Sequence, residues 1–120
     1  MHFVSQCRII AINTHIVLKR RDIMHIHNAI YNTIHKDGIS LSRASGIADF
    51  LLLYIKTPTL LQVYEKTYTI TDPSVVIISG YTPYKYLSVT KPYCDDYIHF
   101  LPRDTDGFLK ELHFPLNQPI

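Results

Sequence analysis

The sequence predicts a mainly β fold, a sandwich or barrel that ends in one short helix. Short runs rich in Ile, Val, Leu and Tyr recur along the chain, and clusters of Gly, Pro, Asp and Ser separate them, as in all-β domains. One capped helical pattern closes the chain. The 120 residues suffice for a single domain with one hydrophobic core.

The N-terminal part carries two overlapping patterns. Residues 1–24 are expected to form an extension or arm before the barrel, and Met24 is an alternative start of the natural protein. Ile26, Ile30 and Ile34 fit one face of a helix and equally one face of a strand. The many β-branched residues around them favour the strand.

The β-barrel itself is expected over residues 25–103. Phe50–Ile55 predicts a strand in the sandwich interior, because it is apolar on both faces and Pro58 follows it. A hairpin is expected next, with its turn at Glu65–Thr67. The other expected strands are Leu60–Tyr64, Tyr68–Thr71, Val75–Ile78, Tyr84–Val89 and Tyr97–Leu101.

Residues 104–120 are expected to form a short helix and an exit segment. Asp104 or Asp106 can cap the helix, since a carboxylate accepts from the free backbone N–H groups of the first turn. Pro115 ends the helical pattern. The residues that share its apolar face are Phe108, Leu109 and Leu112.

Charge, cysteine content and hydropathy exclude several classes of protein. A net charge of +2 is too small to indicate a nucleic-acid-binding module. Cys7 and Cys94 have neither disulfide-framework nor zinc-site spacing, which favours a reducing cytoplasm. The apolar runs are too short for a membrane span, and no signal-peptide pattern is present. We therefore expect a cytoplasmic protein without membrane contact.

The histidines do not complete a metal site. His25 and His27 alternate along a strand and could face one ion. A cupin metal centre needs a carboxylate about four residues later, where this chain has Tyr31. We expect no metal and no cofactor.

Catalytic patterns are also missing. No nucleophile elbow surrounds the serines, and Asp95 and Asp96 should raise the pKa of the Cys94 thiol. The two carboxylates should not act as a pair, because neighbouring strand residues point to opposite faces. We expect no catalytic residues and no enzymatic activity.

A polar set within the apolar strands predicts a pocket for a small polar ligand such as a sugar. Tyrosine rings supply apolar walls, and a few polar tips fix the orientation of a guest. The alternative is that these tyrosines are ordinary residues of a sheet surface. The set comprises Lys56, Tyr64, Tyr84, Tyr86, Asp95, Tyr97 and His99.

From about His27 onward the chain resembles the N-terminal regulatory domain of AraC-type bacterial transcription regulators. Three segments carry the resemblance, in the order and spacing of that family. The first reads R-x-x-G-x-x-D-F-L-L-L-Y-I over Arg43–Ile55, and the second reads D-D-Y-I-H-F over Asp95–Phe100, after Pro92-Tyr93. The third reads F-L-x-x-L-x-x-P-L-N-x-P-I over Phe108–Ile120.

The resemblance implies a cupin-like jelly roll that binds a small effector, often a sugar. It also implies a homodimer in the full-length protein, with DNA contacts only through a C-terminal helix-turn-helix domain outside this chain. Arg43 with Asp49, and Asp96 with His99, are expected to form structural pairs.

Four residues take ligand-binding positions of the family. Lys56 stands where the arabinose-responsive member has a sugar-binding arginine, and Tyr86 matches a pocket tyrosine. Asp95 stands at a histidine position, and Tyr97 at a tryptophan position. Because Asp95 replaces this histidine, arabinose itself is not the expected ligand, but a polar ligand still is. Tyr64, Tyr84 and His99 are expected to line the pocket.

Two other functions fit the same residues. One is a small metal-dependent cupin enzyme, an isomerase or a dioxygenase. The other is a purely structural dimerisation module with a filled barrel.

Overall fold

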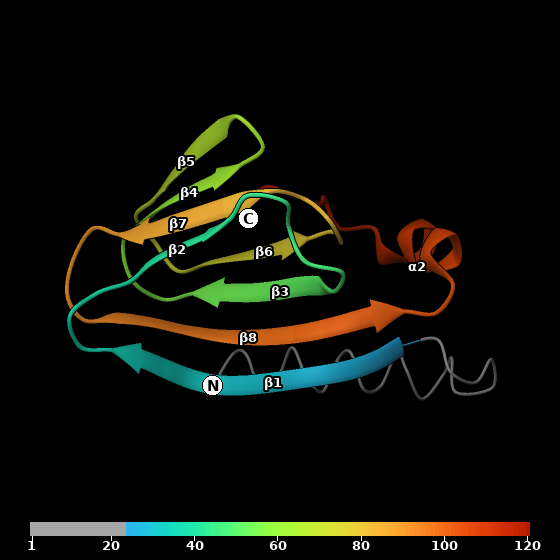
Figure 1. Ribbon diagram of the computed structural model, residues 1–120, viewed down its shortest axis with the longest axis horizontal. Helices are drawn as coiled ribbons and strands as arrows, with labels where there is room; N and C mark the ends of the chain where they lie inside the picture. Colours follow the sequence, from blue (N-terminus) through green and yellow to red (C-terminus); the bar gives the residue numbers. More distant parts are fainter. Residues whose placement is uncertain (1–23) are drawn as a thin grey trace.

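A computed structural model describes residues 24–120, and the expected N-terminal arm lies outside these residues except for Met24. Eight strands and one C-terminal helix make up this part of the chain (Figure 1). The elements are β1 (Met24–His35), β2 (Ser40–Arg43), β3 (Phe50–Ile55), β4 (Thr59–Val63), β5 (Lys66–Ile70), β6 (Ser74–Ile78), β7 (Tyr84–Ser88), β8 (Tyr93–Pro102) and α2 (Thr105–Leu112).

The strands form two antiparallel sheets of four strands each. The first sheet has the order β1-β8-β3-β6, and the second sheet has the order β2-β7-β4-β5. Strands pair from the two ends of the chain inward: β1 with β8, β2 with β7, β3 with β6 and β4 with β5. Two further pairings, β3 with β8 and β4 with β7, join these ladders into the sheets. The expectation of a mainly β sandwich with a C-terminal helix is confirmed.

β3 is the most deeply buried strand, as its apolar sequence predicts. It pairs with β8 on one side and β6 on the other, and most of its side chains are buried. Leu51, Leu53 and Ile55 belong to the core between the sheets, while Phe50 and Leu52 belong to a second cluster on the outer face of the first sheet. Full burial of one such side chain stabilises a fold by about 1.5–3 kcal/mol.

β1 is a strand, so the alternative of a helix at Ile26–Ile34 is wrong. It runs along the edge of the first sheet and pairs only with β8 among the described strands. Its register with β8 shifts between Ile30 and Thr33. Asn32 lies in this irregularity with a φ of 58°, a left-handed conformation that asparagine tolerates better than most residues.

The structure differs from the sequence expectation most at β2 (Ser40–Arg43), which was expected to be a loop, and at the starts of β5 and β8. The β4–β5 turn consists of Tyr64 and Glu65, because Val63 already pairs with Lys66. β8 begins at Tyr93 rather than Tyr97. The run of polar residues after Tyr93 hid the start of this strand, since strand patterns are normally recognised from apolar alternation.

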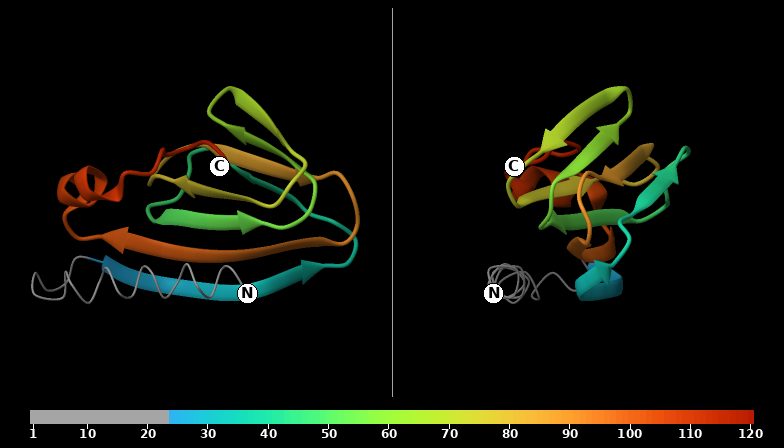
Figure 2. Two further views of the ribbon diagram at one scale, coloured as in Figure 1. Left: turned by 180° about the vertical axis from the view of Figure 1, so that it is seen from behind. Right: turned by 90° about the vertical axis from the view of Figure 1, so that its left-hand side faces the viewer.

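The C-terminal segment covers the outer face and one edge of the first sheet. Asp104 is the N-cap, and its carboxylate accepts from the Gly107 N–H at 3.1 Å. Phe108 and Leu112 pack on the outer face, whereas Leu109, expected on the same apolar face, is 38% exposed. Figure 2 shows α2 at the end of the molecule where β8 finishes. No helix among the described residues is long and apolar enough to span a membrane.

The exit segment after α2 continues the first sheet. The backbone N–H and C=O of Ile120 bond to Val75 at 2.8 and 3.0 Å. Asn117 donates its N–H to the Ile77 carbonyl at 2.8 Å, and its side chain accepts from the Ser79 N–H at 3.0 Å. These bonds occupy the free edge of β6.

Candidate functional site

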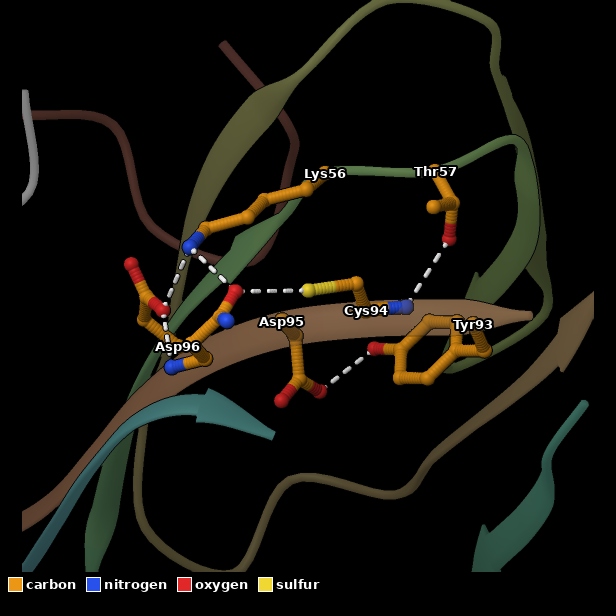
Figure 3. A network of polar contacts seen from close by, with 7 residues as sticks. Lys56, Thr57, Tyr93, Cys94, Asp95 and Asp96 are labelled. Atoms are coloured by element: carbon orange, nitrogen blue, oxygen red, sulfur yellow. Dashed lines mark hydrogen bonds and ion pairs between the residues drawn. The ribbon is translucent and has the colours of Figure 1, made fainter. Parts of the chain in front are cut away.

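β8 carries the polar residues of the site and separates them onto two faces. Asp95 pairs with Ile55 of β3, so its side chain points between the sheets, as Ile55 does. Asp96 pairs with Tyr54 and points to the outer face of the first sheet. Figure 3 shows the two carboxylates on opposite sides of the strand. The prediction that these neighbours face opposite ways is confirmed.

Three tyrosines stand in a row between the sheets. Tyr84 and Tyr86 of β7 stack at 6.4 Å between ring centroids, and Tyr86 stacks on Tyr93 of β8 at 5.8 Å. All three are buried. Burial and the nearby Asp95 carboxylate raise the pKa of Tyr86 and Tyr93 well above the usual value. Their hydroxyls therefore stay protonated, and that of Tyr93 donates a hydrogen bond to Asp95.

Asp95 lies beside this row and is incompletely bonded. It is 2% exposed, and its Oδ2 accepts from the Tyr93 hydroxyl at 2.5 Å. Its Oδ1 has no partner among the described residues. Burial raises the pKa of this carboxyl, and the Tyr93 hydrogen bond opposes the rise.

Thr33 is the cross-strand neighbour of Asp95. The two residues are directly paired between β1 and β8, so their side chains share a face with Cβ atoms about 4.5–5.5 Å apart. Thr33 Oγ1 is also buried without a partner in the described part of the chain. Each unmet buried polar group costs about 1–3 kcal/mol. Two neighbouring residues of paired strands thus each bury an oxygen that makes no hydrogen bond within residues 24–120.

The ammonium of Lys56 does not lie on the face that Asp95 and Thr33 share. Its Nζ lies 2.8 Å from Asp96 Oδ1 and 3.2 Å from Asn32 Oδ1, on the outer face of the first sheet (Figure 3). Its ammonium also lies 4.6 Å from the centre of the Tyr31 ring. The structure therefore separates Lys56 from the other three expected ligand-binding residues. Asp96, expected to pair with His99, pairs with Lys56 instead.

Asn32 was not singled out in the sequence, yet it is bonded to each of the other members of the outer cluster, Lys56, Cys94 and Asp96. Its backbone N–H donates to Asp96 Oδ1 at 2.6 Å, and its side-chain oxygen accepts from Lys56 and from the Cys94 thiol at 3.0 Å. Burial is the largest cause that raises the pKa of Cys94; Lys56 opposes it. An asparagine that interrupts a β-branched run was the available sequence signal.

Tyr97 and His99 continue the inner face of β8 toward the end of the sandwich. Their rings meet edge to face at 5.3 Å. Burial lowers the pKa of His99, which the Asp49 carboxylate partly offsets. Asp49, expected to pair with Arg43, instead accepts from His27 Nδ1 at 2.7 Å.

The remaining expected pocket residues divide in the same way. Tyr84 lies between the sheets, and Arg43 is hydrogen-bonded to its hydroxyl. Burial raises the pKa of Tyr84, and Arg43 opposes this rise. Tyr64 occupies the β4–β5 turn, is 58% exposed and lies away from the interior. Within residues 24–120, no group of three or more His, Cys, Asp or Glu side chains has the geometry of a metal site.

Asp95, Thr33, Tyr86 and Tyr93 form what we call the inner cluster: a buried carboxylate, a threonine hydroxyl and two stacked tyrosine rings. It offers hydrogen bonds and ring surfaces, and the hydroxyls of both tyrosines stay protonated. No known family model matches the chain, and no curated protein matches it.

Proposed function

We propose that this chain is the effector-binding domain of an AraC-type transcription regulator. A small polar ligand, sugar-like in its hydroxyl groups, binds between the two sheets next to Asp95. The observation that carries the proposal is that two cross-strand neighbours, Asp95 and Thr33, each bury an oxygen (Oδ1 and Oγ1) without a partner in the described residues. A guest that bonds to both atoms recovers the free energy that their burial costs.

The order of strand pairing supports a cupin-like jelly roll. β1 pairs with β8, β2 with β7, β3 with β6, and β4 with β5. Pairing in this order makes the chain one long antiparallel ribbon. Rolling this ribbon adds the pairings of β3 with β8 and β4 with β7. Jelly rolls of eight strands in two sheets have this architecture, and cupins belong to them.

The helix offers a route for the signal. β3 and β8 hold the inner cluster on one face and contact α2 on the other. The Phe108 ring lies 6.0 Å from the Phe50 ring and 5.7 Å from the Phe100 ring. A ligand that prefers one arrangement of these strands shifts the packing of α2 and thereby a DNA-binding domain beyond it. The full-length regulator acts as a homodimer.

Thermal unfolding with a panel of sugars and sugar derivatives tests the proposal. A ligand present at 100 times its dissociation constant should stabilise the domain by about 2.7 kcal/mol. Tyr86→Phe, which removes one hydroxyl of the inner cluster, should weaken the shift, and Tyr64→Phe is the matched control on the exposed turn. The absence of a shift with every compound of the panel would contradict the proposal.

A purely structural dimerisation module is the second candidate, because the buried row of three tyrosines already fills part of the interior. In such a module Tyr86→Ala lowers stability, and no compound changes the unfolding temperature of either protein. Titration of the parent with the panel therefore separates the two functions.

A further inference from the structure

The inner cluster also indicates which kind of polar ligand fits, provided that the proposed ligand-binding function holds. We infer that the ligand is a sugar or other polyol that carries a protonated primary amine, and that its ammonium group binds between Asp95 and Thr33. This inference concerns the charge of the ligand, which the proposed function leaves open.

Hydrogen-bond chemistry is the first argument. The unused carboxylate oxygen of Asp95 is an acceptor, and the Thr33 hydroxyl accepts through its lone pairs. Because the two residues are direct cross-strand partners, one small group can reach both. An ammonium can donate to both oxygens at once. A ligand hydroxyl can donate to Asp95 and accept from Thr33, so it is the charge of the carboxylate that separates an amine from a hydroxyl here.

Charge is the second argument. Asp95 is 2% exposed, and its only bonded partner among the described residues is the neutral Tyr93 hydroxyl. The nearest lysine of the cluster, Lys56, is bound to Asp96 on the other face of the strand. His35 faces Asp95 from the end of β1, but it is exposed and packs on the Tyr93 ring at 6.0 Å. A buried carboxylate is stabilised by a cationic partner, and the ligand supplies one.

The aromatic surroundings are the third argument. Tyr86 and Tyr93 stack on each other beside the carboxylate. Tyrosine faces attract cations, and the combination of aromatic rings with a carboxylate is typical of amine recognition. A neutral sugar can pack on the same rings, but it lacks the electrostatic attraction between a cation and the carboxylate and ring faces.

Paired ligands provide the test. Glucosamine is compared with glucose, and galactosamine with galactose, by calorimetric titration of the purified chain at neutral pH. Each pair differs by one amine in place of one hydroxyl. We expect at least one amino sugar to bind about tenfold or more tightly than its neutral counterpart, as a charge-assisted hydrogen bond is stronger than a neutral one.

Two isosteric variants locate the effect. Asp95→Asn should remove the preference for the amino sugar, and Thr33→Val should reduce it while the shape of the side chain is kept. Asp72→Asn, in the exposed turn before β6, is the matched control and should leave the preference unchanged. Urea unfolding of each variant establishes that it is folded.

The outcomes separate this inference from the proposed function. Neutral sugars that bind as tightly as their amino counterparts overturn the inference and leave the ligand-binding function in place. An amine preference that survives in Asp95→Asn also overturns it. If no compound of either type binds, the inference and the proposed function fail together.

Discussion

Asp95 and Asp96 are consecutive residues of β8, yet their buried carboxylates lie on opposite faces of the first sheet and have different partners. Among the described residues, Asp96 pairs with a lysine on the outer face, and Asp95 accepts only from a tyrosine hydroxyl on the inner face. Asp96 is thus neutralised by a cation, although its Oδ2 also lacks a hydrogen-bond partner in the described residues, whereas Asp95 has no cation bonded to it there. The structural role of Asp96 and the binding role that we propose for Asp95 are separated by a single step along the strand.

Lys56→Met should strongly destabilise the protein. Asp96 is 0% exposed, so loss of the ammonium leaves a buried charge without its cation. We expect the free energy of unfolding in urea to fall by about 3 kcal/mol. Lys85→Met, on the exposed face of β7, should change it by less than about 0.5 kcal/mol. Adding Asp96→Asn to Lys56→Met should recover part of the loss; a strictly additive pair would argue against this ion pair.

Asp95→Asn should stabilise the domain at neutral pH. Because burial raises the pKa of Asp95, the folded state binds the proton more tightly than the unfolded state does. The stability of the parent therefore decreases as the pH rises through the folded-state pKa, and asparagine does not titrate. The advantage of the variant should shrink as the pH is lowered below the normal aspartate range. Urea unfolding across this pH range measures the difference in unfolding free energy between Asp95→Asn and the parent. A difference that does not change with pH would show that the buried carboxylate is not its cause.

Tyr93→Phe should change the titration of Asp95. The hydroxyl of Tyr93 donates to Asp95 Oδ2 and thereby favours the ionised carboxyl. Its removal should raise the pKa of Asp95 further and lower the free energy of unfolding by about 1–2 kcal/mol. Carbon-detected NMR titration of the Asp95 carboxyl gives the pKa directly. Tyr64→Phe, at an exposed turn, serves as the control and should leave both quantities unchanged.

Asn117→Ala should loosen the exit segment from β6. The asparagine has a φ of 63°, and its side-chain oxygen accepts from the Ser79 N–H at 3.0 Å. Alanine loses this bond and strains the left-handed backbone, so we expect a loss of about 2 kcal/mol. Glycine also loses the bond but relieves the strain, and Asn117→Gly should be less harmful by about 1 kcal/mol. Equal losses in the two variants would show that backbone strain is unimportant here.

Local sequence patterns were sufficient for the main strands and the closing helix. The apolar run of β3, the turn residues that follow it and the cap at Asp104 all act over a few residues, and these features reappear in the structure. The opposite orientation of Asp95 and Asp96 also followed from the sequence, because side chains alternate along any strand. The inward-facing residues Tyr86, Asp95 and Tyr97 could be selected for the same reason.

Tertiary structure decided the partners of the charged side chains. Lys56 follows the inward-facing Ile55, and its long side chain reaches the outer face of the first sheet. There its ammonium bonds to Asn32 and Asp96. Asp49 pairs with His27 because β1, far from β8 in the sequence, pairs with β8 in the first sheet. Thr33 and Asp95, each with a buried unbonded oxygen, become neighbours only through the register between these strands. Pairings of this kind depend on which strands become neighbours, and no pattern within a single strand specifies that choice.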